Sequence, residues 1–273
     1  MFLGRGQQEM FSYEFMRRAM IAILIISPLF GMVGTMIVQK KMAYFSDALG
    51  HSALTGIAVG VICGIGNTTI SMMIFAVCFA LLLNYISRKG LSSSDTLISV
   101  FASCATALGL AILSRGGNFS NYSALLVGDV LSISWVEIFE LIGLFFLILV
   151  FWWISINRLT AISIHPTLAK SRSISVRVME DAFAVLVALL VMLSVRWVGI
   201  LLINALLILP AASSRNISTN FREYTYFSMI FSLFSGVVGL TVSYFTDMAT
   251  GPMIVIVASV IYFATYIYGK DRA

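Results

Sequence analysis

Long apolar runs, separated by short polar breaks, fill almost the whole chain. There are nine of them, near residues 19–38, 46–66, 70–87, 96–114, 135–156, 178–195, 197–212, 225–246 and 252–268. A helix that crosses the hydrocarbon core of a bilayer needs about 20 mostly apolar residues. The seventh run is short, and only Arg196 and Trp197 separate it from the sixth. The pattern therefore predicts an all-α polytopic membrane protein with eight or nine transmembrane helices.

The composition agrees with a bilayer as the solvent of this chain. Of its 273 residues 60% are hydrophobic and 11% are charged, which is more apolar surface than a soluble domain of this size buries. We expect a single transmembrane domain over residues 1–273. No GxxxxGK[ST] phosphate loop occurs, so we expect no nucleotide-binding domain and no enzymatic activity. Cys63, Cys78 and Cys104 lie in or beside apolar runs and are expected to be small buried residues.

The basic residues are distributed unevenly between the two sides of the predicted membrane. If all nine runs span, twelve Lys and Arg residues fall in one set of alternate breaks: Lys40, Lys41, Arg88, Lys89, Arg158, Lys170, Arg172, Arg177, Arg215, Arg222, Lys270 and Arg272. The other set holds five. The positive-inside rule places the larger set in the cytoplasm, with the amino terminus outside. This topology explains the net charge of +5 better than a nucleic-acid surface, which would need one continuous basic patch.

Three glycines in the second run are spaced four residues apart. Gly56, Gly60 and Gly64 form a small-xxx-small ladder, a pattern that lets helix backbones approach closely in membranes. We interpret the ladder as a helix-packing face, which would bury this helix within the bundle.

Asp47 and His51 are the ionisable pair that most needs an explanation. A charge at the middle of a span costs at least about 2.5 kcal/mol, and a spacing of four places both side chains on one helix face. An imidazole with a carboxylate forms a mixed nitrogen and oxygen site, which suits zinc, manganese or iron. A carboxylate near a helix start with a hydrogen-bonded histidine remains an alternative.

Two further carboxylates lie in breaks that the topology places outside. Asp129 and Asp247 could gather cations at the mouth of a pore. Ordinary solvation of a loop carboxylate is the alternative interpretation.

The segment from Lys41 to Gly60 resembles the basic-M-A/S-x-x-x-D-x-x-x-H-x-x-L-x-G signature of the ABC permeases that take up zinc, manganese and iron. Further similar blocks begin at Asp95, Leu126, Val198 and Gly251, in the order of that family, and the likeness covers about residues 15–268. The resemblance implies a fold like that of the vitamin B12 and siderophore permeases. It also implies a multi-pass protein of the bacterial cell (inner) membrane.

The family resemblance further implies partners and roles. The expected partners are a second copy of the chain, cytoplasmic ATPase subunits, an extracellular or periplasmic metal-binding receptor and membrane lipid, with no nucleic acid. We expect no permanently bound cofactor, only the transported ion. Asp47 and His51 correspond to metal contacts of the pathway. An ATPase-coupling segment, otherwise readable as a charged turn, comprises Ser213, Ser214, Arg215, Asn216, Phe221, Arg222 and Glu223.

The sequence favours zinc only slightly as the cargo. Many family members have Pro-Gly where this chain has Thr55 and Gly56, and the departure is more similar to zinc-type members. One alternative is a secondary metal transporter driven by an ion gradient, which should show paired repeats and midspan carboxylate relays. Another is an ABC permease for an organic siderophore or vitamin, which should lack the D-x-x-x-H pair.

Overall fold

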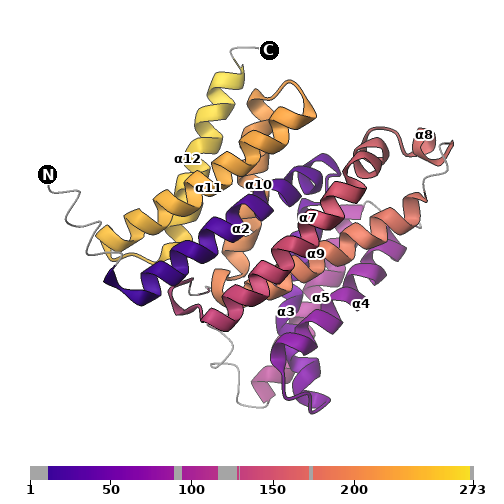
Figure 1. Ribbon diagram of the computed structural model, residues 1–273. Helices are drawn as coiled ribbons and strands as arrows, with labels where there is room; N and C mark the ends of the chain where they lie inside the picture. The colour runs from indigo at the N-terminus through magenta and orange to yellow at the C-terminus, as the bar shows by residue number, and fades with distance from the viewer. Residues whose placement is uncertain (1–11, 89–93, 116–127, 129, 172–174, 271–273) are drawn as a thin grey trace, which may run out of the picture. The chain divides into compact units, whose positions relative to one another are not determined.

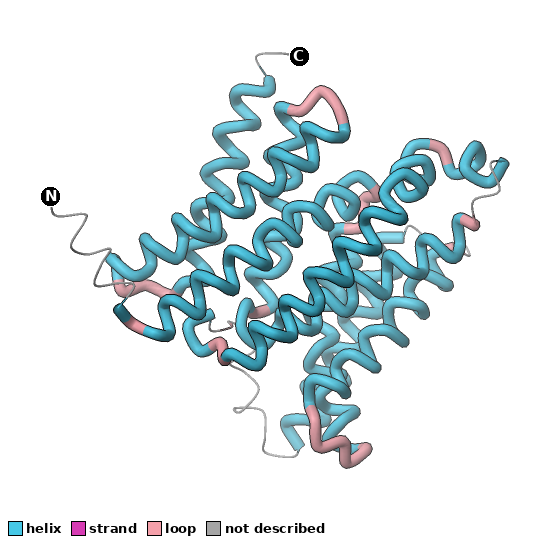
Figure 2. Tube along the Cα trace, viewed as in Figure 1, coloured by secondary structure: helices cyan, strands magenta, loops and turns pink. Residues whose placement is uncertain are grey.

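A computed structural model describes residues 12–88, 94–115, 128, 130–171 and 175–270, and these are helical apart from short connections (Figures 1 and 2). Within the described residues, eight helices are long and apolar enough to cross a membrane. They are α2 (Glu14–Gln39), α3 (Ala43–Ile62), α4 (Thr68–Ser87), α5 (Ser94–Arg115), α7 (Trp135–Ile164), α9 (Val176–Val198), α11 (Phe221–Thr246) and α12 (Thr250–Lys270). The prediction of a helical multi-pass membrane protein is confirmed.

The short seventh run forms α10 (Ile200–Ile217), which is not among these eight. Gly199 separates it from α9 with a φ of +83°, a left-handed conformation that glycine adopts without steric cost. At 18 residues α10 is about 27 Å long, slightly less than the hydrocarbon core. Its last turns carry Ser213, Ser214 and Arg215, so its apolar part is shorter still.

The chain divides into two compact units. The first comprises residues 1–38, 127–147 and 197–273, and in it α10, α11 and α12 pack against one another pairwise. Helix α2 packs on α11, where the Ser228 hydroxyl donates a hydrogen bond of 2.6 Å to the carbonyl of Gly31. The Tyr224 hydroxyl donates one of 3.3 Å to the carbonyl of Thr35. Polar side chains thus join spanning helices by reaching their backbones.

The second unit comprises residues 39–126 and 148–196, and its central helix is α3, which packs against α4 and α5. A Cβ atom on Gly56 would lie 2.9 Å from the Cα of Met72, and one on Gly60 would overlap the Ser71 side chain. These two glycines therefore hold α3 close to α4. Gly64 does not belong to this contact, because it lies beyond the end of α3 with a φ of +69° and open space around it. Its role is to turn the chain.

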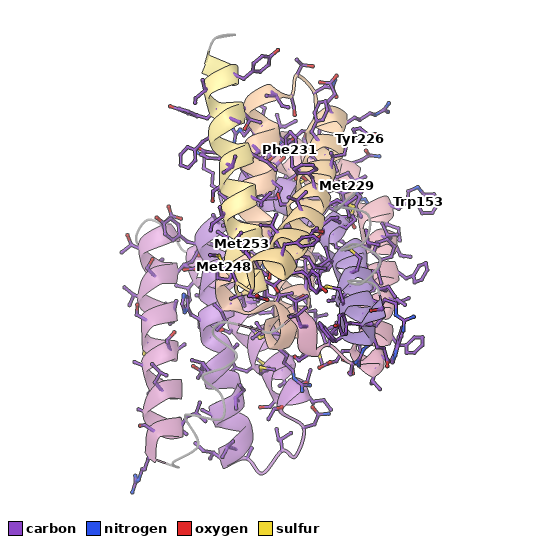
Figure 3. All side chains as sticks on the ribbon, turned by 90° about the vertical axis from the view of Figure 1, so that its left-hand side faces the viewer. Trp153, Tyr226, Met229, Phe231, Met248 and Met253 are labelled. Carbon is purple, nitrogen blue, oxygen red and sulfur yellow. The ribbon has the colours of Figure 1, made fainter. Side chains whose placement is uncertain are left out.

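The exposed surface of the spanning helices is apolar. Trp153 of α7 is 85% exposed and projects away from the ribbon in Figure 3. The prediction of buried cysteines is wrong, because Cys63, Cys78 and Cys104 are all exposed. A thiol is only weakly polar and behaves as a small hydrophobe, so an outward position costs little when hydrocarbon replaces water.

Candidate functional site

The connection before α3 determines in which turns of the helix Asp47 and His51 lie. Helix α2 ends at Gln39, and Lys41 adopts a left-handed φ of +57° that turns the chain. Helix α3 then starts at Ala43, with the amide nitrogens of Phe45 and Ser46 bonded back to the carbonyl of Met42. Asp47 therefore lies in the second turn of the helix and His51 one turn later.

Asp47 and His51 lie side by side on α3. The Nε2 atom of His51 is 3.6 Å from Oδ1 of Asp47, and the two side chains are 40% and 48% exposed. That separation is longer than a hydrogen bond but leaves both groups facing the same point. The arrangement offers one nitrogen and one carboxylate to a cation, as the spacing of four predicted.

The serines of the same helix are occupied elsewhere. Ser46 donates its hydroxyl to the carbonyl of Ala43, and Ser52 donates to that of Leu49. Both are buried. The half-exposed face of this part of α3 is therefore left to Asp47 and His51, with Tyr44 one turn earlier.

One turn beyond His51, α3 touches α5 closely. The Thr55 hydroxyl donates to the carbonyl of Ala105. A Cβ atom on Gly109 would lie 2.6 Å from the amide nitrogen of Thr55. This contact sets the two helices in a fixed register, in which the serines of α5 come level with the pair.

Tyr44 of α3 and the first turns of α5 line an open hollow of about 550 Å³, to which neither Asp47 nor His51 contributes. Five of its six lining residues carry a polar group, but most of the exposed lining area is apolar; the residues are Tyr44, Asp95, Thr96, Ser99, Val100 and Ser103. Sequence reasoning assigned no role to these residues. The signal was present, because polar residues recur every three to four positions from Asp95 through Ser99 to Ser103 in an otherwise apolar run.

The pair cannot complete a coordination shell alone. Among the described residues, no group of three or more His, Cys, Asp or Glu side chains could hold a metal ion. Structural zinc sites have four ligands, so two from this chain leave two to come from water, from a hydroxyl or from another chain.

Of the other two predicted carboxylates, the structure describes one. Asp247 is the C-cap of α11, exposed and in a left-handed conformation with a φ of +52°. Asp129 lies outside the described residues.

The predicted coupling segment contains both packing residues and surface residues. Ser213 and Ser214 are buried, and the Ser214 hydroxyl donates a hydrogen bond of 2.6 Å to the carbonyl of Tyr224. Asn220 caps α11 by accepting from the amide of Glu223, whose carboxylate accepts from the amide and hydroxyl of Thr219. This resembles a capping box, except that Glu223 reaches back to Thr219, the residue before the cap. Its exposed charges are those of Arg215 and Arg222.

Comparisons with known proteins agree along the whole chain. Residues 12–269 match the ABC 3 transport family. The high-affinity zinc uptake system membrane protein ZnuB of Haemophilus influenzae is 30% identical, over 95% of this chain and 99% of its own length. The manganese transport system membrane protein MntC of Listeria innocua is 26% identical, over 97% and 94%.

Two solved structures share the fold. PsaBC from Streptococcus pneumoniae, determined in complex with a Fab, superposes with a TM-score of 0.86 at 25% identity, over 99% of this chain and 100% of that one. An inward-facing transporter described as of the metal-chelate ABC type superposes with a TM-score of 0.67 at 15% identity, over 98% and 89%.

Proposed function

Because the chain belongs to the ABC 3 transport family, we propose that it is the permease subunit of an ABC importer that carries a divalent transition metal into the cytoplasm. Relatives named for zinc uptake and for manganese transport support this proposal over nearly the full chain. The chain is a transport component and not an enzyme; ATP hydrolysis belongs to a separate cytoplasmic ATPase. A metal-binding receptor outside the membrane delivers the ion.

The observation that carries the proposal is the Asp47–His51 pair on α3, with Nε2 and Oδ1 3.6 Å apart on a half-exposed face. One carboxylate and one imidazole suit a borderline divalent ion better than a soft Cu(I) ion. In a homodimer around a central pathway, two such pairs supply four ligands. A site on a pathway must also release the ion, and two ligands per chain keep binding modest.

Zinc is the cargo that we expect ahead of manganese or iron. This expectation rests on a resemblance: many family members have Pro-Gly where this chain has Thr55 and Gly56, and that departure is more similar to zinc-type members. Relatives named for zinc and for manganese are of similar identity, so uptake measurements must name the metal.

The decisive experiment measures metal uptake into proteoliposomes that contain the permease, its ATPase and its receptor. Wild type is compared with Asp47→Ala and His51→Ala for zinc, manganese and iron. Glu140→Ala and His165→Ala are matched controls, because both residues are exposed and distant in sequence from the pair. We expect uptake of one metal to collapse in the first two variants alone. Normal transport by both would make the pair structural.

A secondary metal transporter makes a different prediction for the same vesicles. Uptake driven by an ion gradient would continue with a catalytically dead ATPase and stop with an ionophore. The proposed importer stops with the dead ATPase and is insensitive to the ionophore. An organic-ligand permease would need a siderophore or vitamin as cargo and would ignore loss of the pair.

A further inference from the structure

A pocket of about 240 Å³ lies in the second unit, and neither Asp47 nor His51 lines it. The connection between α2 and α3, the end of α4 and the first turns of α9 contribute its charged residues, which are Lys40, Lys41, Arg88 and Glu180. The rest of its lining is Met42, Phe45, Asn84, Ser87 and Ile98.

Arg88, one of the cations of this pocket, already forms ion pairs with carboxylates. The guanidinium of Arg88 donates to both carboxylate oxygens of Asp181, at 2.5 and 3.2 Å. Its Nε atom lies 3.6 Å from Oε2 of Glu180. Bidentate pairing of this kind fixes a guanidinium firmly. Arg88 therefore shapes the pocket and has little capacity left for another anion.

Lys40 is in a different position. Its side chain is only 8% exposed, and Nζ lies 3.6 Å from Oε1 of Glu180. Among the described residues the ammonium has no hydrogen-bond acceptor, although it lies 5.7 Å from the centre of the Phe183 ring. An ammonium carries three donors, and a buried charge with unsatisfied donors is costly. An anionic oxygen in the pocket would satisfy it.

The charges around the pocket leave room for one anion. Lys40, Lys41 and Arg88 are positively charged, and Glu180 and Asp181 are negatively charged. The cluster therefore has one more positive charge than negative charges. Lys41 is exposed at the rim. A group with a single negative charge and several oxygens, such as a phosphodiester, would balance the cluster.

The position of the pocket along the helices indicates a lipid. It lies at the end of the unit where the basic residues accumulate, which the positive-inside rule makes cytoplasmic. Met42, Phe45 and Ile98 add apolar surface beside the charges. Its volume is below the roughly 300–1,000 Å³ of whole small-molecule sites, so it suits a headgroup whose remainder stays in the bilayer.

We propose that this pocket binds the phosphate group of an anionic membrane phospholipid. Basic pockets between transmembrane helices on the cytoplasmic side are sites where acidic headgroups bind. Lys40 would donate to the phosphate oxygens from inside the pocket, and Lys41 would hold the headgroup from the rim. Free phosphate shares this chemistry but gains nothing from the apolar lining.

Native mass spectrometry of the intact permease complex tests the proposal. The complex is titrated with phosphatidylglycerol or with phosphatidylcholine, and the bound fraction gives an affinity for each. We expect wild type to retain phosphatidylglycerol preferentially. Lys40→Gln and Lys41→Asn should each weaken retention about fivefold, the factor for one basic residue at an anionic membrane surface. Asparagine suits the left-handed backbone of Lys41. Lys170→Gln, an exposed lysine outside the pocket, should change nothing.

Two further measurements separate this site from the alternatives. Glu180→Gln removes a competing carboxylate and should strengthen retention of phosphatidylglycerol, which a purely structural ion pair would not do. Inorganic phosphate is added to the lipid-bound complex and should displace little of it. Equal retention by wild type and by both lysine variants would overturn the proposal, and so would complete displacement by millimolar phosphate. Because Lys41 is exposed, its variant keeps the test valid if Lys40→Gln fails to fold.

Discussion

Lys40 lies in the short connection between α2 and α3, outside both spanning segments, and its burial has a consequence for stability. Burial lowers the pKa of its ammonium below the usual 10.5; Glu180 opposes this and Arg88 adds to it. The folded chain therefore binds this proton less tightly than the unfolded chain. The free energy of unfolding should therefore increase as the pH is raised from the folded-state pKa towards 10.5, because the folded chain loses this proton first.

The measurement is the thermal midpoint of the chain in neutral detergent, without anionic lipid, from pH 8 to pH 10.5. Wild type should gain stability over this range relative to Lys40→Met, in which the titrating group is absent. An identical pH dependence in the two proteins would contradict the burial of a charged Lys40.

Gly34 is the residue at which a single methyl group should cost most. A Cβ atom there would overlap the carbonyl oxygen of Leu207 on α10, and a backbone atom cannot move aside cheaply. Gly34→Ala should destabilise the chain by about 1–3 kcal/mol, the usual cost of overpacking. Gly143→Ala is the matched control, because its Cβ would meet open space and alanine is the better helix former by roughly 0.5–1 kcal/mol. Thermal unfolding in detergent should separate the two variants in opposite directions.

At the scale of the element, two helices begin with a capping asparagine. Asn67 accepts from the amides of Thr69 and Ile70 at the start of α4, and Asn220 accepts from that of Glu223 at the start of α11. Replacing either by alanine should cost about 0.5–2 kcal/mol. Only Asn220→Ala should also lower the metal transported per ATP hydrolysed, because only Asn220 caps a residue of the proposed coupling segment, Glu223. Equal coupling ratios in the two variants would remove the segment from that role.

The helices could be predicted from the sequence, but the packing faces of some of them could not. Apolar length alone indicated α3 and α5, and the spacing of four correctly placed Asp47 beside His51. The same spacing wrongly extended the glycine ladder to Gly64, because a four-residue repeat does not reveal where a helix ends. The polar row of α5 was visible in the sequence, but only the contact between Thr55 and Ala105 brings it level with the pair. Which face of a helix packs against its neighbours depends on tertiary contacts, and a single sequence does not show those contacts directly.

At the scale of the whole molecule, the distribution of basic residues predicts which helix ends face the cytoplasm. Cys63 directly follows α3 and is exposed, on the predicted outer side. In a Cys78→Ser and Cys104→Ser background, an impermeant maleimide added to intact cells should label Cys63. Lys170→Cys, introduced after Cys63→Ser, should react only in permeabilised cells. The reverse pattern would invert the topology and move the lipid pocket to the outer leaflet.

The proposed metal pair, together with the proposed homodimer, also constrains how the cargo of this transporter can change over generations. One chain contributes one carboxylate and one imidazole, so on a pathway shared by two identical copies a single gene encodes every protein ligand. A codon change at Asp47 or His51 then alters two ligands at once, and no variant exists in which only one of the four has changed. Selection for a different metal would therefore change the proposed site in steps of two ligands.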